Sequence, residues 1–460
     1  MSMMDFITID KDICTGCQEC SKVCPVSAIE GEHGKPQTIN QNKCIRCGQC
    51  VQKCKSYVSP AIDGNEKYEA VRNARRLPES VSEPLFAAYN MSRVQDVFAA
   101  LDNPSKICVV HAAPAVRVAL GEEFGLKPGS IEDKRMAAAL YALGFEHVYD
   151  ANFAADLTIM EEGTELINRV TKGTGVLPMI TSCCPGWVSY LEKNRPQLKD
   201  HLSTCKSPQQ MQGAIEKTYG AKKLKVDGGS IYTVSVMPCT AKQAEAFRDE
   251  MWDSGHRDID AVITTRELAY MIKEKGIDYL SLESRDFENV LGNYSGAGAI
   301  FGVTGGVMEA AIRTGYELIS GKKLDNLEIE NVRGEDGVRY GEVKIDNLTL
   351  KVVVVTGLKN VESVLDRIEK QELDAHFIEV MACPQGCISG GGQPKLIEDT
   401  DFAEVIGLRR EAIYRHDKEC EIRKSHENPD VKALYDEYLG EIGGEKAHHL
   451  LHTEYCLEEQ

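Results

Sequence analysis

Short apolar runs alternate with amphipathic segments along most of the chain beyond about residue 72. The apolar runs are rich in β-branched residues, and most are followed by a segment whose apolar positions recur with a helical period. Such alternation predicts βα units and largely parallel sheets. We therefore expect an α/β domain with two mostly parallel sheets flanked by helices. The predicted strands lie at residues 106–112, 177–183, 231–239, 261–265, 350–357 and 376–383, and the predicted helices at 134–145, 185–194, 241–250, 266–276 and 361–370.

Two runs of closely spaced cysteines replace this pattern near the N-terminus. The spacing Cys-x-x-Cys-x-x-Cys-x-x-x-Cys occurs twice within residues 14–54, as in bacterial-type ferredoxins. In that arrangement the first three thiolates of a run reach one [4Fe-4S] cluster and the fourth crosses to the other. We expect a small α+β domain with two such clusters. One would be held by Cys14, Cys17, Cys20 and Cys54, and the other by Cys44, Cys47, Cys50 and Cys24.

The composition narrows the class of protein. With 460 residues the chain is long enough for about three domains. Its net charge of -18 argues against binding to nucleic acid or to an anionic membrane. Neither a basic and apolar leader nor an apolar run of about 18 residues is visible, so we expect a cytoplasmic protein. The 17 cysteines are tightly grouped, which favours iron–sulfur sites over the alternatives of zinc or disulfides.

Three predicted strands end in motifs that contain cysteine. They are ITSCCPGW with Cys183 and Cys184, VMPCTAKQAE with Cys239, and EVMACPQGC with Cys383 and Cys387. In open α/β sheets, ligands bind beyond the carboxyl ends of the strands. We therefore expect the three strand ends to deliver thiolates to one buried cluster site, which the apolar residues before each cysteine keep dry.

These three motifs, with the last one extended to EVMACPQGCISGGGQP, resemble the signature motifs of the [FeFe]-hydrogenase family. The resemblance covers nearly the whole chain, up to EKAHHLLHTEY, which is similar to the family's small-subunit segment. The plant-type [2Fe-2S] domain of larger members is missing, so the chain resembles the shorter, two-cluster form. The implied domains are residues 1–75, ferredoxin-like; residues 76–405, catalytic; and residues 406–460, helical and small-subunit-like.

The resemblance also implies a cofactor site. Cys184, Cys239, Cys383 and Cys387 would hold a [4Fe-4S] cubane, and Cys387 would bridge it to a diiron subsite with carbon monoxide, cyanide and a dithiolate amine, which together form the H-cluster. Lys242 would meet a cyanide ligand, and an exposed helix lysine is the alternative. Residues 390–392, all glycine, would let the backbone approach the cofactor, unless they form a flexible loop. The implied pocket lining is Pro114, Ala115, Met237, Phe301, Val307 and Met381.

A proton route is implied as well. Cys183 resembles the thiol that exchanges protons with the bridging amine. Glu162, Glu165 and Arg169 share one helical face, and with Ser203 they match a path from Cys183 through Glu162, Ser203, Glu165 and Arg169 to solvent. Without the resemblance, a solvated, salt-bridged helix is the simpler interpretation of these residues.

The implied activity is the reversible oxidation of dihydrogen to protons and electrons, with ferredoxin or flavodoxin as the electron partner. The diiron unit would be installed by hydrogenase maturation proteins. An iron–sulfur assembly protein and a hydrogen sensor are the alternatives, and the presence of Cys183, Lys242 and GGGQP favours the enzyme.

Two other groups of residues have less specific interpretations. Basic side chains around the cysteine loops could receive an acidic redox partner, although solvated surface charges are the simpler interpretation. His448, His452 and Cys456 could form a zinc site, although the segment already has an explanation in the family resemblance. The basic residues are Lys22, Lys43, Arg46, Lys53 and Lys55.

Overall fold

The small N-terminal domain is built from short strands and helices. The computed structural model describes residues 6–335, 337–396 and 401–455. Strand β1 pairs with β6, β2 with β3 and β4 with β5, all antiparallel. Two of these pairs join the domain to residues 85–90, so the predicted boundary at residue 75 separates paired strands. The elements are β1 Ile7–Ile9, α1 Glu19–Val23, β2 Ile29–Glu30, β3 Thr38–Ile39, α2 Gln49–Lys53, β4 Tyr57–Val58, α3 Pro60–Asp63, α4 Asn65–Ala74, β5 Leu85–Phe86 and β6 Ala88–Asn90.

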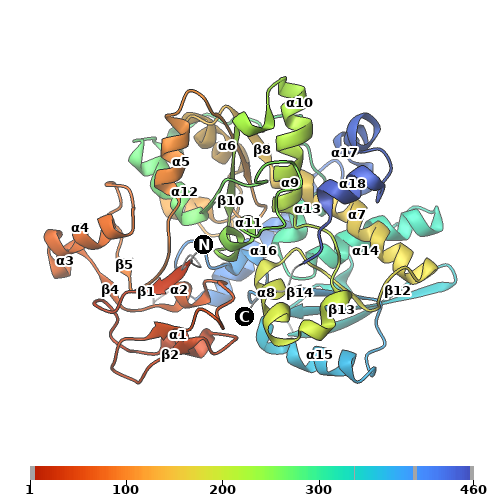
Figure 1. Ribbon diagram of the computed structural model, residues 1–460, viewed down its shortest axis with the longest axis horizontal. Helices are drawn as coiled ribbons and strands as arrows, with labels where there is room; N and C mark the ends of the chain where they lie inside the picture. The colour runs from red at the N-terminus through yellow and green to blue at the C-terminus, as the bar shows by residue number, and fades with distance from the viewer. Residues whose placement is uncertain (1–5, 336, 397–400, 456–460) are drawn as a thin grey trace.

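Two four-stranded sheets form the rest of the framework, in the upper and the lower right parts of Figure 1. The first has the order β11-β10-β7-β8 and is entirely parallel. The second has the order β12-β13-β14-β9, in which β12 is an antiparallel edge strand. The predicted fold class is confirmed. The strands are β7 Ile107–Ala112, β8 His147–Asp150, β9 Met179–Ile180, β10 Ile231–Met237, β11 Ala261–Thr264, β12 Val338–Ile345, β13 Leu348–Thr356 and β14 Phe377–Met381.

Helices cover both sheets, and the longest of them, α7, packs against α9, α13 and α14. Its first turn is capped by Asp150, whose side chain accepts a hydrogen bond from the Asn152 amide, and it ends at Gly173 with φ 66°. Helix α12 begins with a capping box between Thr264 and Glu267. The helices are α5 Val94–Leu101, α6 Asp133–Ala142, α7 Ala151–Lys172, α8 Pro185–Asn194, α9 Pro208–Ile215, α10 Ala221–Leu224, α11 Ala241–Ala246, α12 Thr265–Glu274, α13 Gly296–Ala299, α14 Gly306–Ser320 and α15 Glu362–Glu369.

The C-terminal helices are packed into the α/β domain. Helix α16 (Phe402–Glu419) packs on α13, α17 (Pro429–Leu434) on α7, and α18 (Glu445–Leu451) on α9. Since α16 continues through the predicted boundary at residues 405/406, that boundary falls inside one helix. The last segment is therefore a covering layer of the α/β domain.

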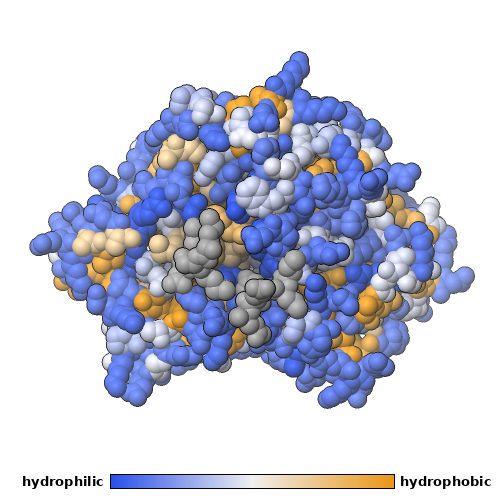
Figure 2. All heavy atoms as spheres, viewed as in Figure 1, coloured by the Kyte–Doolittle hydropathy of each residue, from blue (hydrophilic) through white to orange (hydrophobic). Residues whose placement is uncertain are grey.

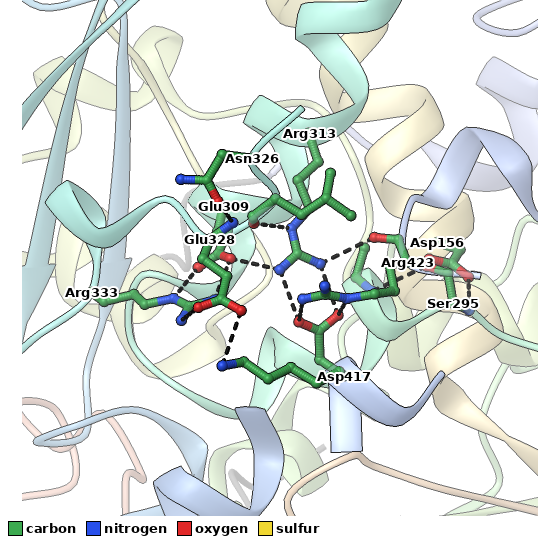
Figure 3. Close-up of polar contacts among 12 residues, drawn as sticks. Asp156, Ser295, Glu309, Arg313, Asn326, Glu328, Arg333, Asp417 and Arg423 are labelled. Carbon is green, nitrogen blue, oxygen red and sulfur yellow. Dashed lines mark hydrogen bonds and ion pairs between the residues drawn. The ribbon is translucent and has the colours of Figure 1, made fainter. Parts of the chain in front are cut away.

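A buried ion network fastens α16 to α14 (Figure 3). The Arg313 guanidinium lies 2.6 Å from a Glu309 oxygen and 2.8 Å from an Asp417 oxygen, and all three side chains are fully buried. Arg333 lies 2.7 Å from Glu309, and Arg423 lies 2.6 Å from Asp417. Buried charges are tolerated only when each has a partner, so the network fixes how the two helices meet.

The surface in Figure 2 is mostly hydrophilic, and apolar residues on this face form small separate groups. This agrees with the charged composition. Among the helices in the described part of the chain, none is both long enough and apolar enough to cross a membrane.

We predict that Arg313→Met destabilises the protein by about 3–5 kcal/mol, because the buried carboxylates of Glu309 and Asp417 each lose one of their two guanidinium partners. Anaerobic thermal unfolding should show this as a lower apparent midpoint. Lys322→Met is the matched control, since Lys322 and Asp346 form an exposed ion pair, which is worth about 0–1 kcal/mol. Equal midpoints for the two variants would contradict the role given to the network.

Candidate active site

The three cysteine motifs meet at one pocket, as the strand order predicts. Cys184 follows β9, Cys239 follows β10, and Cys383 and Cys387 follow β14; all four line the same pocket. None of the cysteines that the structure describes is in a disulfide. The space between the lining residues is not filled by protein atoms. Two sheets therefore deliver four thiols to one space between them.

The electrostatics of these thiols fit a bound metal cluster. Burial raises the pKa of Cys239 to about 11, and neighbouring Cys184 adds to this increase, while Lys242 opposes it. Burial also raises the pKa of Cys383 well above its ordinary value, with further contributions from Cys239 and Cys184. Four thiolates cannot coexist in such a dry pocket without cations among them. An iron–sulfur cluster would supply such cations, and four cysteine thiols are a donor set that suits it.

Apolar side chains close the pocket around the thiols. Five of the six predicted lining residues are there, and Val307 is the exception. Val307 lies in the first turn of α14 and is fully buried in the hydrophobic core beneath the pocket, so it is not among the lining residues. The five that line the pocket are Pro114, Ala115, Met237, Phe301 and Met381.

Lys242 points into this site from the start of α11. It is buried, and its Nζ donates to the Cys183 carbonyl oxygen at 3.1 Å and to Glu245 Oε2 at 2.9 Å. Burial lowers the pKa of Lys242, but Glu245 outweighs it, so the pKa lies above its ordinary value and the ammonium stays charged. Glu245 is itself held by Ser207 and Gln209. The alternative of an exposed helix lysine is thereby excluded.

The three glycines after Cys387 are buried and do not form a flexible surface loop. A Cβ at Gly390 would lie 2.1 Å from the Pro238 carbonyl oxygen, and one at Gly391 would lie 2.5 Å from the Cys47 carbonyl oxygen. The absence of a side chain at Gly391 thus lets the small domain pack closely against this segment. At Gly390 it lets the β10–α11 turn do the same. Gly390 also lines the pocket, so the expectation that these glycines let the backbone approach the cofactor stays a prediction.

The small domain reaches the pocket through its second cysteine loop. Cys47 is one of the residues lining the pocket. Gln49 Nε2 donates to Cys383 Sγ at 3.3 Å and to the Ser389 carbonyl oxygen at 3.1 Å. One cysteine loop is thereby placed beside the four-thiol pocket.

The eight cysteines of the small domain fall into two neighbouring sets. Cys54, Cys14 and Cys17 are the thiols that contribute to raising the pKa of Cys20, after burial itself. The pKa of Cys47 is raised mainly by burial, and then by neighbouring Cys44 and Cys24. The fourth cysteine of each run therefore lies with the other run, which is the grouping that the spacing predicts.

The residues of the predicted proton path form a partly connected chain. Ser203 Oγ donates to Glu165 Oε2 at 2.8 Å, and Arg169 Nη2 donates to Glu165 Oε1 at 2.6 Å. Glu162 is buried, and the pKa of Cys183 is raised by burial and then by nearby Glu162. The structure therefore brings all five predicted residues into one region.

Glu162 and Arg169, near the two ends of the predicted proton path, differ from what the path predicts. Glu162 has both carboxylate oxygens buried without a well-aligned hydrogen-bond partner among the described residues. Burial raises its pKa to about 8, Glu165 adds to the increase, and Ser203 offsets part of it. Arg169 is only 6% exposed and donates to the carbonyl oxygens of Val176, Asp200 and Leu202. Because a guanidinium does not deprotonate, Arg169 anchors Glu165 and cannot relay a proton.

Some residues at the site have no signal in the sequence. Glu379, inside β14, accepts hydrogen bonds from the Gly305 and Met308 amides at 2.6 and 2.7 Å and so caps α14. Burial raises its pKa to about 7, and these amides oppose the increase. In the sequence EVMAC, the motif points to Cys383 as a ligand, but nothing in it indicates a role for Glu379. Gln49, between two cluster cysteines, is similarly inconspicuous.

Fold and site together define an iron–sulfur oxidoreductase, and comparison with known families makes the class specific. Residues 106–391 match the iron only hydrogenase large subunit, C-terminal domain; residues 403–456 match the iron hydrogenase small subunit; and residues 6–55 match a 4Fe-4S dicluster domain. The chain belongs to the iron-only, or [FeFe], hydrogenase family.

Individual relatives agree with this assignment. The chain is 42% identical to the NADP-reducing hydrogenase subunit HndD of Solidesulfovibrio fructosivorans, over 97% of this chain and 74% of that protein. It is 46% identical to the periplasmic [Fe] hydrogenase large subunit of Nitratidesulfovibrio vulgaris, over 85% of this chain and 87% of that protein. The structure of an apo [FeFe]-hydrogenase HydA1 variant from Chlamydomonas reinhardtii matches with a TM-score of 0.70 and 43% identity, over 80% of this chain and 99% of that one. A cytosolic Fe-S cluster assembly factor of Danio rerio is more distant, at 30% identity over 77% of this chain and 87% of that protein.

We predict that Gly391→Ala slows electron transfer to the pocket and leaves the reaction at the pocket itself largely intact. The added Cβ meets the backbone of Cys47 and Gly48 and pushes the small domain away, and a misplacement of about 1 Å can cost ~10²-fold in rate. Hydrogen production from a reduced dye should fall much further than isotope exchange between dihydrogen and heavy water, which needs no external electrons. Gly407→Ala is the control, because a Cβ there meets no atom within 4 Å. A parallel fall of both rates would contradict the prediction.

Proposed function

We propose that this protein reversibly oxidises dihydrogen to protons and electrons at an H-cluster held by Cys184, Cys239, Cys383 and Cys387. The observation that carries the proposal is the convergence of these four thiols with the charged Lys242 in one apolar pocket. When bound there, the cluster supplies the iron site at which the hydrogen–hydrogen bond is made or broken. Lys242 contributes a fixed positive charge, which stabilises anionic ligands strongly in a dry pocket.

Electrons would travel through two accessory [4Fe-4S] clusters in the small domain. The set of Cys44, Cys47, Cys50 and Cys24 would be the inner one, since Cys47 lies at the pocket. The set of Cys14, Cys17, Cys20 and Cys54 would be the outer one. A chain of three clusters explains why the small domain and the α/β domain are in such close contact.

Ferredoxin or flavodoxin is the electron partner we propose. The NADP-reducing relative favours a second candidate, in which the electrons pass to another subunit of an enzyme complex. The basic residues near the cysteine loops do not decide between them, because most have local partners. Lys22 and Lys43 form exposed ion pairs with Glu19 and Glu30, and Arg46 and Lys53 lie over the rings of Phe6 and Phe402.

Protons would move along Cys183, Glu162, Ser203 and Glu165. A Cys183 thiol has a proton to give, and Glu162, with a pKa of about 8, exchanges protons near neutral pH. The Ser203 hydroxyl donates to Glu165, which Arg169 holds in place. The inner part of this route is buried, so a proton there can move only between these groups.

The alternative functions have less support. An iron–sulfur assembly protein or a hydrogen sensor does not account for the buried Lys242–Glu245 pair beside Cys183. The proposal includes a cytoplasmic location and loading of the diiron unit by hydrogenase maturation proteins.

The decisive experiment is infrared spectroscopy of the protein purified anaerobically after coexpression with such maturation proteins. We expect absorption bands of metal-bound carbon monoxide and cyanide, together with hydrogen turnover. Cys387→Ala should lose these bands, because Cys387 would bridge the cubane and the diiron unit. Four-iron clusters without the bands, under conditions that load a control hydrogenase, would refute the proposal in favour of an assembly role.

A further prediction concerns Glu162 and pH. Because burial raises its pKa to about 8, Glu162 is protonated and able to donate below that pH and is charged above it. Hydrogen production should therefore decline as the pH rises through about 8. Glu162→Gln should lower turnover by ~10²–10⁴-fold and lose this decline, while the infrared bands stay unchanged. A variant with normal turnover and an unchanged pH profile would exclude Glu162 from the route.

A further inference from the structure

A second cluster of ligand-type side chains lies beside the proton route, outside the cysteine motifs. It joins Glu165 of α7, Cys205 of the loop before α9, and His452 after α18. Cys205 Sγ lies 3.9 Å from Glu165 Oε2 and 3.9 Å from each ring nitrogen of His452. One ligand atom of each residue lies within 4.8 Å of the other two. Sulfur, nitrogen and oxygen donors thus surround one point.

We propose that Glu165, Cys205 and His452 form a binding site for a divalent cation of the zinc type. Bond lengths to zinc of about 2.3 Å for sulfur and 2.0–2.1 Å for nitrogen put the two donors of a tetrahedral site about 3.6 Å apart. The observed 3.9 Å needs a shift of only a few tenths of an ångström. Water would complete the coordination, as in other three-ligand zinc sites.

The surroundings of His452 suit a metal ligand. Its Nε2 lies 3.0 Å from Glu161 Oε2, so Nδ1 is the ring nitrogen that remains for a cation, and Cys205 Sγ lies 3.9 Å from it. A histidine whose second nitrogen bonds a carboxylate is the usual arrangement at zinc sites. Glu161 is itself fixed by the Tyr435 hydroxyl and the Gly443 amide. Without a cation, the Thr204 hydroxyl pairs with Nδ1 at 2.7 Å, so binding replaces a hydrogen bond and requires no refolding.

Backbone contacts hold the three ligands together before any cation binds. Cys205 and His452 form an antiparallel β-bridge. The Lys206 amide donates to the Leu451 carbonyl oxygen, and the Thr453 amide donates to that of Thr204, both at 2.8 Å. The site is therefore preorganised by the way the C-terminal segment docks. Its thiol is Cys205, whereas Cys456 of the sequence-based zinc hypothesis lies outside the described residues.

A second group of possible ligands is a poorer site. Glu317, His426 and Glu427 also bring three ligand atoms together. However, Lys424 Nζ already lies 2.8 Å from Glu317 and 2.9 Å from Glu427. A cation there would have to displace this ammonium and would gain no sulfur ligand.

The site has a consequence for turnover, which rests on the proposed function. Glu165 Oε1 is taken by Arg169, so a cation would bind Oε2, the oxygen to which Ser203 donates. Binding would remove the hydrogen bond between Ser203 and Glu165 and interrupt the proton route. Zinc should therefore inhibit the enzyme reversibly, and a chelator should restore activity.

The test is zinc K-edge X-ray absorption on the cluster-loaded protein after titration with one equivalent of Zn²⁺. We expect one sulfur near 2.3 Å and nitrogen or oxygen near 2.0–2.1 Å. Cys205→Ser should lose the sulfur, and His452→Gln should weaken binding by at least tenfold. His449→Gln is the matched control, an exposed histidine in the helix that precedes His452, and should bind like the parent. A sulfur-free shell, a four-sulfur shell, or equal binding by all variants would overturn the proposal.

Turnover gives an independent readout. Zinc should inhibit the parent protein and His449→Gln, and it should inhibit His452→Gln at least tenfold more weakly. If zinc binds in the expected shell without affecting turnover, the cation site is established and the route through Glu165 is refuted. If the protein has infrared bands of the diiron unit but no hydrogenase activity, the proposed function fails while the absorption experiment still decides on the site.

Discussion

The arrangement of this protein depends on the cost of burying four thiols together. Thiolates repel one another in an apolar pocket, and thiols in contact there gain little from hydrogen bonding. The pocket is therefore useful to the protein only as the place of a metal cluster. Parallel strands deliver their carboxyl ends to one edge of a sheet, and here two sheets contribute: β10 carries Cys239, whereas β9 and β14 carry the other three.

Close backbone approach is the second requirement, and it explains residues that the thiols alone do not. Gly48 of the small domain and Gly391 of the α/β domain are in near contact, and a Cβ on either one would meet the other. Gln49 adds a hydrogen bond to Cys383. Electron transfer depends on short distances between clusters, so small residues at this interface serve the reaction as directly as the ligands do.

The sequence predicted what is local and missed what depends on docking. The strand and helix pattern and the cysteine spacing are local signals, and the fold class is confirmed. Val307 is expected at the pocket from the family resemblance, but its position in α14 turns it into the core. The family resemblance implies Arg169 at the solvent end of the path, whereas carbonyl oxygens of another loop bury it. Spacing along a helix fixes a direction, and only packing fixes exposure.

The C-terminal segment illustrates this limit most clearly. Nothing in its pattern reveals that His452 lies against Cys205, since 247 residues separate them. In the structure this segment packs beside the proposed proton route, where Thr204 and Glu161 both contact His452. The ion network of Arg313 and Asp417 fixes the start of the same segment. Because the segment is held at both ends against α7 and α14, the surroundings of Glu165 are set by residues distant in sequence as well as by its own helix.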